Sequence, residues 1–312
     1  MPELILHHYD PSPFSEKVRL VLGLKGLAWR SVIVPMVLPK PDLTPLTGGN
    51  RRTPVLQIGA DVYCDTSLIA EELERRFPAP TIYPGDSRGL CRLLSLWADS
   101  VLFLPSSRYA TRDSSVFPLG FQADRAAMRG HAPLAAERVS AEAPHYLEQL
   151  QLQLAFIEQM LGDGRACMLG DAPSLADFAV YARVWWSRLF GGDQGELASL
   201  PHVAAWAARI GAIGHGQRSE MAPQEALDLA AAALPEVPAP DASGAGMLRP
   251  GQRVSIATES FGPDPVTGEI IIVTADKIAL RRADPRVGEV VVHIPRLGYN
   301  VPAADADAAP RW

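Results

Sequence analysis

The sequence predicts an α+β protein with several domains. A mixed α/β segment is expected over residues 1–84, an all-α bundle over residues 88–232 and a small antiparallel β module over residues 247–312. Short apolar runs alternate with amphipathic stretches in the first segment, whereas helical periodicity dominates the second. A run rich in Pro, Ala and Gly, PEVPAPDASGAG, then precedes several β-branched runs, which favours a linker and a separate β module.

Composition sets limits on the class of protein. The chain has 312 residues and a net charge of −6, which argues against a nucleic acid as partner. No apolar run approaches the roughly 20 residues of a membrane helix, and the start MPELILHHYD lacks the features of a secretory signal. The three cysteines are widely spaced and suggest neither a disulfide framework nor a metal site. A cytoplasmic protein without metal or membrane contact is therefore expected.

The first segment predicts strands and helices in a definite order. Strands are expected at LILHH, WRSVIVP, TPVLQIG and DVYC, and helices at SEKVRLVLGLKGL and DTSLIAEELERRF. The early alternation indicates a βαβ unit, and the last two strands indicate a hairpin around Gly59 to Asp61.

The remaining elements follow from the same patterns. The strongest helical segments are RLLSLWADSVLFL, PHYLEQLQLQLAFIEQML, SLADFAVYARVWWSRLF and PHVAAWAARIGAIG. The β module is expected to contain strands at RVSIAT, GEIIIVTA, KIALRR and EVVVHI.

The junction HHYDPSPFSEKVRL carries the first chemical signal. Pro13 suits the first turn of a helix, which places Ser12 at or beside the N-cap. The helix dipole, worth roughly 0.3–1 kcal/mol, and a hydroxyl hydrogen bond, worth roughly 1.5–3 kcal/mol, would lower a bound thiol's pKa by about two units. Alternatively, Ser12 is only a cap. Tyr9 is either a second hydroxyl facing the anion or an ordinary aromatic residue at a strand end.

Two further stretches can each be interpreted either as structural or as ligand-binding. In RRTPVL, Pro54 suits a strand start, and a cis Thr53–Pro54 bond would expose the Thr53 backbone to an extended peptide. In CDTSLIAEEL, Asp65 and Thr66 precede a helix. They form either a capping box or a grip on an amino-acid group, with amides for its carboxylate and Asp65 for its ammonium.

These motifs, in this order, resemble the glutathione S-transferase superfamily of serine type. The resemblance rests on SPF at the first helix, TPVL at a strand, DTS at a later helix, and the segments SLADFAVYA and LPHVAAWAARIGAIGHG. It implies a thioredoxin-like βαβαββα domain, a helical bundle, and glutathione bound where the two meet. Cysteine-type members carry C-P-F or C-P-Y, so S-P-F-S argues against disulfide exchange.

The resemblance also implies site residues. Ser12 would stabilise the glutathione thiolate, with Tyr9 as a second hydroxyl. Thr53 would hold the cysteine backbone, and Asp65 and Thr66 the γ-glutamyl group. The cations Lys40 and Arg52 are candidates for the glycyl carboxylate. Further glutathione contacts are expected from Phe14 and from Pro54 of the TPVL motif. Two departures are that residues 39–52 do not match the usual approach to the proline, and that Asp65 replaces the usual glutamate.

The predicted function is therefore an enzyme that activates glutathione as co-substrate for attack on a small apolar electrophile. Aromatic residues of the bundle either line the electrophile pocket or pack the core and a subunit contact: Trp97, Phe103, Tyr109, Trp185, Trp186. The alternative is a glutathione-binding interaction protein with little turnover, which the β module favours. A glutathione-assisted isomerase or dehalogenase would use the same thiolate. A homodimer is expected from the resemblance.

Overall fold

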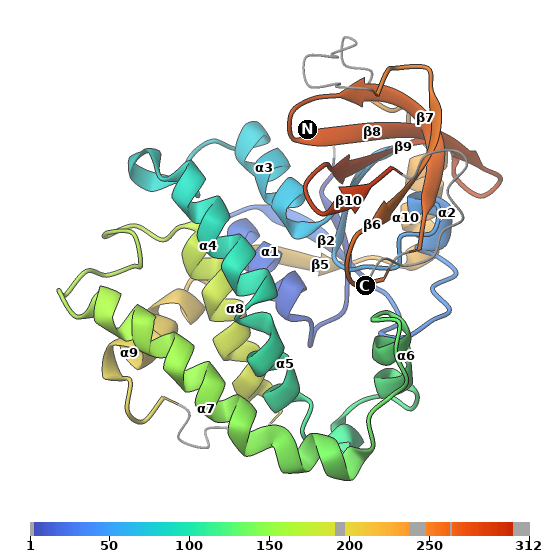
Figure 1. The fold of residues 1–312 in the computed structure, drawn as a ribbon. Coiled ribbons are helices and arrows are strands. Elements are labelled where there is room, and N and C mark those ends of the chain that lie inside the picture. The colour runs from blue at the N-terminus through green and yellow to red at the C-terminus, as the bar shows by residue number, and fades with distance from the viewer. Residues whose placement is uncertain (1–2, 191–196, 237–247, 263, 302–312) are drawn as a thin grey trace.

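The computed structural model describes residues 3–190, 197–236, 248–262 and 264–301. Figure 1 shows a helical bundle on one side and a large sheet, extended by the C-terminal strands, on the other. This confirms the predicted fold class. Most of the predicted linker lies outside the described residues.

The described strands form one ten-stranded sheet in the order β10-β6-β7-β8-β9-β4-β3-β1-β2-β5. The strands of the first domain begin and end close to the predicted runs: β1 (Ile5–His8), β2 (Ala28–Ile33), β3 (Val55–Ile58) and β4 (Asp61–Cys64). β1 pairs in parallel with β2 and antiparallel with β3, and β3 forms the expected hairpin with β4. With the three helices α1 (Pro13–Leu24), α2 (Thr44–Thr47) and α3 (Thr66–Arg76), the order is βαβαββα, as the resemblance implies.

Helices cover the two faces of this part of the sheet. α1 and α3 contact each other, and α1 also packs on the bundle helix α8 (Leu175–Leu189). Their apolar residues join those of the bundle in one large core, which includes Val21, Leu56 and Phe178. α2 lies against the opposite face, beside β4. The first domain is therefore held between two separate cores.

The bundle contains α4 (Arg88–Ser100), α5 (Phe103–Ala110), α7 (Ala136–Leu161), α8 and α9 (Pro201–Gly211), with the 3-10 turns η1 (Pro84–Asp86) and η2 (Ser114–Val116). The capping box at Ser174 and Asp177 is present. Asp177 also accepts hydrogen bonds from the Trp206 indole and the Met168 amide, each at 2.8 Å, so this buried carboxylate fixes α8 to α9. α7 contains the predicted helical segment that begins at Pro144, but it starts eight residues earlier, at Ala136, and continues through the proline.

Residues 88–232 are not helical throughout, and this expectation needs correction. Residues Gln217–Glu220 form β5, which pairs in parallel with β2 at the edge of the sheet, and α10 (Pro223–Ala232) packs against β2, α2 and β9. The helical pattern stops because Gly214 and Gly216 take positive φ, and a Cβ on Gly216 would lie 2.5 Å from the Leu27 carbonyl oxygen. The Trp29 indole donates to the His215 carbonyl oxygen at 2.7 Å and fixes this return.

The C-terminal strands extend the same sheet. They are β6 (Arg253–Thr258), β7 (Val266–Val273), β8 (Lys277–Asp284), β9 (Gly288–Pro295) and β10 (Tyr299–Asn300), and they pair antiparallel with one another. β9 joins β4 in parallel, with Tyr63 opposite His293. The two rings stack at 4.3 Å, and His293 Nε2 lies 2.7 Å from Asp61 Oδ1. The second core therefore includes residues of both β4 and β9, such as Val62 and Val292.

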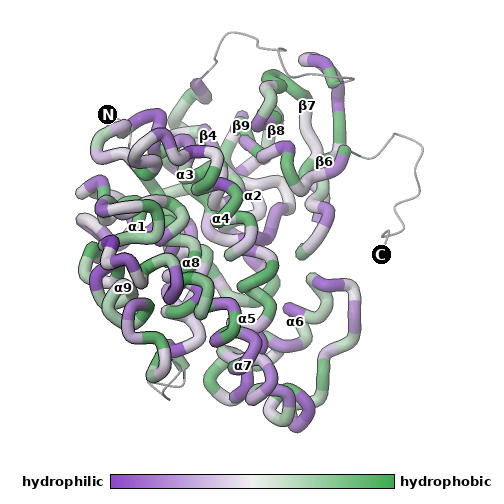
Figure 2. Tube along the Cα trace, turned by 60° about the vertical axis from the view of Figure 1, so that its left-hand side comes forward, coloured by the Kyte–Doolittle hydropathy of each residue, from purple (hydrophilic) through white to green (hydrophobic). Residues whose placement is uncertain are grey.

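The short helix α6 (Phe121–Ala127) stands apart from the bundle helix α9. In Figures 1 and 2 it lies on the same side of the molecule as β6. The Gly262 amide, in the loop after β6, donates to the Met128 carbonyl oxygen at 2.8 Å. This contact joins the C-terminal strands to the segment around α6, on either side of the site described next.

Candidate functional site

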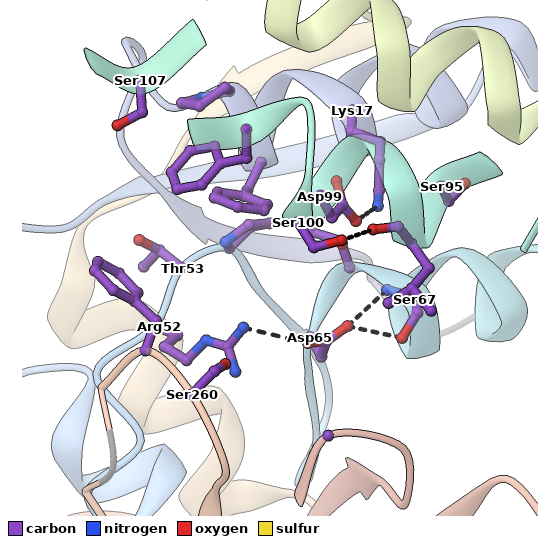
Figure 3. Close-up of a pocket in the computed structure, with 18 of the residues that line it drawn as sticks. Lys17, Arg52, Thr53, Asp65, Ser67, Ser95, Asp99, Ser100, Ser107 and Ser260 are labelled. Carbon is purple, nitrogen blue, oxygen red and sulfur yellow. Dashed lines mark hydrogen bonds and ion pairs between the residues drawn. The ribbon is translucent and has the colours of Figure 1, made fainter. Parts of the chain in front are cut away.

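A cavity of about 940 Å³ lies where the first domain, the bundle and the C-terminal strands meet. Its walls come from the start of α1, the loop before β3, the start of α3, helices α4 to α6, and the loops after β6 and β9. All but one of the predicted site residues line it: Tyr9, Phe14, Lys40, Arg52, Thr53, Pro54, Asp65 and Thr66. Figure 3 shows part of this lining.

The exception is Ser12, which is fully buried and absent from the described lining. It is the N-cap of α1, and its Oγ accepts a hydrogen bond from the Ser15 amide at 3.2 Å. The neighbouring Pro11 and Pro13 do line the cavity. The geometry therefore gives Ser12 the capping role, and its contact with a thiolate stays a prediction.

Tyr9 is the hydroxyl at this junction that reaches the cavity. Its Oη accepts a hydrogen bond from Arg125 Nη2 at 3.3 Å, and the Lys40 ammonium lies 5.7 Å from its ring centroid. The phenolic proton has no acceptor among the described residues, which leaves it available to a ligand.

The start of α3 combines a charge, free helix-end amides and a strained backbone. Asp65 is the N-cap with φ of 79°, and its Oδ1 accepts from the Ser67 amide at 2.9 Å and the Ser67 hydroxyl at 2.7 Å. Such backbone geometry in a residue other than glycine costs on the order of 1–3 kcal/mol and is concentrated at functional sites. Thr66 lines the cavity beside it. This helix end can hold a carboxylate at its amides while Asp65 holds an ammonium.

Arg52 and Thr53 enter the cavity from the loop before β3. The Arg52 guanidinium lies 3.7 Å from Asp65 Oδ2, and Figure 3 shows the two side chains facing each other. It also donates to Thr258 Oγ1 and Tyr299 Oη, each at 3.2 Å, so the C-terminal strands fix its position. The Thr53–Pro54 peptide bond is cis.

Lys40 is a buried cation that forms no ion pair with the described residues. Its side chain is 4% exposed and lines the cavity, and it makes no hydrogen bond or ion pair within the described chain. Burial, reinforced by the positive charges of Arg125 and Arg51, lowers its pKa to about 7. A buried ammonium is costly unless an anion approaches it, so the residue fits a ligand carboxylate.

Sequence reasoning missed a second ion pair and several cations of the lining. Lys17 and Asp99 form an ion pair at 2.5 Å on the bundle side (Figure 3), and the fully buried Arg183 donates to the same aspartate at 3.0 Å. The missed cations are Arg51, Arg92, Arg108, Arg125 and Arg129. Only Arg108 lies in the irregular stretch 105–118. The five cations come from separate segments, and periodicity does not indicate which of these segments pack around one cavity.

The predicted aromatic set divides in two. Phe103 and Trp186 line the cavity and stack at 6.0 Å. Trp97 packs against the bundle core, Tyr109 is buried outside the described lining, and Arg19 lies over the ring of Trp185. Two aromatic residues therefore offer an apolar surface to a second ligand.

The cysteines offer no alternative nucleophile at the described site. All three are buried and free, and burial raises the pKa of the Cys64 thiol to about 12, so this thiol stays protonated. Burial also lowers the pKa of His7 to about 4. Among the described residues, no group of three or more His, Cys, Asp or Glu side chains is placed to hold a metal ion.

This lining suits a small peptide with charges at both ends. The α3 start with Asp65 matches an amino-acid head group, Thr53 matches an extended backbone, and Lys40 matches a distal carboxylate. Tyr9 supplies a phenolic hydroxyl to the same lining. The residues present therefore fit glutathione.

Comparison with known proteins places the chain in a family. Residues 6–81 match the glutathione S-transferase N-terminal domain, and residues 116–213 match the glutathione S-transferase C-terminal domain. Among curated proteins, the chain is 30% identical to FtsZ-localized protein A of Caulobacter vibrioides, over 61% of this chain and 79% of that protein. It is 28% identical to maleylacetoacetate isomerase of Pseudomonas aeruginosa, over 65% of this chain and 90% of that protein.

One solved structure also shares the C-terminal strands. A GST-like protein from Pseudomonas syringae is 39% identical, with a TM-score of 0.75, and the match covers 96% of this chain and all of that one. The two curated matches cover only 61% and 65% of this chain, and the part outside each match is long enough to contain these strands. Of the described helices, none has the length and apolar character needed to cross a bilayer. The two matched domains and these relatives show that the chain belongs to the glutathione S-transferase superfamily.

Proposed function

We propose that the protein is a glutathione transferase whose cavity binds glutathione and activates its thiol for attack on a small electrophile. The observation that carries this proposal is the convergence on one cavity of the α1 start, the Thr53–Pro54 loop and the α3 start. In this proposal Asp65 and Thr66 hold the γ-glutamyl group, Thr53 the cysteinyl backbone, and Lys40 the glycyl carboxylate. Arg52 orients Asp65.

The chemistry needs only a stabilised thiolate. The Tyr9 hydroxyl donates to the sulfur, and the amide end of α1, fixed by the Ser12 cap, adds a favourable field. The thiol proton leaves to solvent. With an aryl halide, the sulfur forms a bond to the ring carbon and the halide departs with its electron pair. Phe103 and Trp186 provide the apolar surface for the ring.

The test compares two hydroxyl variants. Tyr9→Phe is expected to slow conjugation of 1-chloro-2,4-dinitrobenzene by about 10- to 100-fold and to raise the pKa of bound glutathione, followed by thiolate ultraviolet absorbance. Glutathione affinity, measured by calorimetry, should stay near that of the wild type. If Tyr9→Phe keeps the conjugation rate and Ser12→Ala loses it, Ser12 and not Tyr9 contacts the thiolate. Absence of glutathione binding at millimolar concentration would refute the proposal.

A second candidate is a glutathione-binding interaction protein with little turnover. It is favoured by the relative named FtsZ-localized protein A and by the additional C-terminal strands. Glutathione binding without conjugation across a broad panel of electrophiles would support it. The relative named maleylacetoacetate isomerase favours including glutathione-dependent isomerisation in that panel, since the same thiolate would act.

We also propose a homodimer and a cytoplasmic location. The dimer is supported by Leu90 and Leu93, which lie one turn apart on α4 and are 49% and 66% exposed. Leu93→Glu should shift the sedimentation coefficient to that of a monomer. Leu119→Glu, at a fully exposed leucine away from α4, is the matched control. An unchanged coefficient in Leu93→Glu would exclude this face.

A further inference from the structure

We infer that the second substrate carries a carboxylate, held by arginines around α6. The inference rests on the proposed function and names its substrate class. It concerns a set here called the α6 cations: Arg108 in the last turn of α5, Arg125 in α6, and Arg129 just after α6. All three line the cavity.

Among the described residues that line the cavity, every charged side chain outside the α6 region has an ionic partner. Lys17 pairs with Asp99, Arg52 with Asp65, and Arg92 with Asp276, while Glu71 pairs with Arg88 outside the lining. The cations that remain are Lys40, Arg51, Arg108, Arg125 and Arg129. Against these five stand Asp124, which pairs with Arg51 and Arg125, and the half-buried Asp264, 4.0 Å from Arg51.

Glutathione does not balance this excess. If its glycyl carboxylate neutralises Lys40, two positive charges remain, and Arg108 and Arg129 have no acidic partner within 4.0 Å among the described residues. Glu142, whose charge Arg108 influences, is itself paired with Arg138 at 2.7 Å. A second anion is therefore needed to complete the site.

The α6 cations repel one another in a partly buried setting. Arg129 donates to the Arg125 carbonyl oxygen at 3.3 Å, and burial together with the charges of Arg108 and Arg125 lowers its pKa to about 10. Asp124 relieves it only at Arg125, and this carboxylate is shared with Arg51. Among the described residues, no carboxylate pairs with Arg108 or Arg129. An anionic ligand relieves it, and guanidinium groups bind carboxylates with favourable geometry.

The surroundings add an apolar component. Arg129 lies over the ring of Phe261 at 4.9 Å, and Arg125 over that of Phe121 at 4.5 Å, with both rings in the lining. Phe261 comes from the loop after β6, so the C-terminal strands complete this compartment. An electrophile with a planar apolar body and one carboxylate fits between these rings.

The experiment compares two electrophiles that differ by a charge. 1-Chloro-2,4-dinitrobenzene is neutral, and 4-chloro-3,5-dinitrobenzoate carries a carboxylate on a similar ring. In the wild type, kcat/KM is expected to be higher for the benzoate than for the neutral halide, after each value is corrected for the uncatalysed rate. Arg108→Gln/Arg129→Gln should lower kcat/KM for the benzoate about tenfold and that for the neutral halide less than about twofold. Arg165→Gln, an exposed arginine paired with Asp163 outside the lining, is the matched control.

Equal losses for both electrophiles, or no loss for either, would overturn the inference. Should glutathione bind without turnover, the enzymatic proposal fails separately, and the inference is then tested by calorimetry with the two S-aryl glutathione conjugates. Tighter binding of the carboxylated conjugate, lost in the double variant, supports it, and equal binding overturns it. If glutathione itself does not bind, 3,5-dinitrobenzoate and 1,3-dinitrobenzene replace the conjugates with the same two outcomes.

Discussion

Arg52 donates a hydrogen bond to Tyr299 Oη at 3.2 Å, joining the loop before β3 to the last described strand. The guanidinium also lies 5.7 Å from the Tyr299 ring centroid and faces Asp65. A residue of the C-terminal strands therefore positions a side chain of the proposed glutathione site. The strands contribute to the site as well as to the fold.

Tyr299→Phe should raise the KM for glutathione about fivefold and leave kcat nearly unchanged. Arg52 loses one acceptor but keeps Thr258 and Asp65, and one such bond contributes about 1 kcal/mol. Steady-state kinetics with glutathione varied at a saturating electrophile measures both constants. Tyr146→Phe in α7 is the control. A fall in kcat at constant KM would contradict the positioning role.

Glutathione affinity should weaken as the pH rises through about 7. The pKa of Lys40 in the fold is about 7, below its ordinary 10.5, so the free protein loses this charge above pH 7 while a bound carboxylate favours the charged form. Calorimetry with S-methylglutathione from pH 6 to 8.5 avoids titration of the thiol. Lys40→Arg keeps the charge and should bind with a flat pH profile, and an equally flat profile in wild type would refute the assignment.

The lowered pKa of Lys40 also determines how the free energy of unfolding changes with pH. A lysine whose pKa is lowered in the fold binds fewer protons there than in the unfolded chain between about pH 7 and 10. Its contribution to the free energy of unfolding therefore rises with pH across that window. Lys40→Met should flatten this rise, as measured by urea denaturation at pH 7 and pH 9.5.

Ser12→Ala should lower the free energy of unfolding by about 1 kcal/mol, because the helix loses the side chain that accepts the Ser15 amide. Ser12→Asn supplies another capping oxygen and should recover most of the loss. Chemical denaturation of the three proteins makes the comparison. Equal stability in the alanine variant would show that the cap is energetically unimportant.

Removal of the C-terminal strands should leave a chain that aggregates. A chain ending at residue 236 exposes the β4 edge, now paired with β9, and the apolar side chains of the second core. We expect loss of soluble protein and of a cooperative thermal transition. A soluble, cooperatively unfolding truncated protein would show that the first domain and bundle are self-sufficient.

The sequence carried the local information about the fold. The Pro13 start of α1, the Thr53–Pro54 loop and the Ser174 capping box were predicted because each depends on a few neighbouring residues. The parallel pairing of β4 with β9 joins residues about 230 positions apart, and no periodicity reports such a partner. The return of β5 to the sheet edge depends on the close approach of Gly216 to the Leu22 and Leu27 carbonyl groups, about 190 positions away in the sequence.

The site divides in the same way. Eight of the nine predicted residues line the cavity, because motif order places the loops at one edge of the sheet. The burial of Ser12, and the lack of an ion pair for Lys40 within the described part of the chain, depend on how segments pack. The cations that act on Lys40, for example, are Arg51 and Arg125. The combined charge of Lys40, Arg51 and Arg125 therefore arises only when the cavity is assembled.

The unbroken ladder from β5 to β10 has a mechanical consequence. The loop that carries Arg52, the loop that carries Phe261 and the strand that carries Tyr299 are all attached to this one sheet, so none of them can move as a rigid flap without breaking backbone hydrogen bonds. We therefore expect ligands to enter and leave on the helical side of the molecule, so that chemical cross-linking of α6 to the loop after β6 slows ligand exchange more than cross-links between strands do.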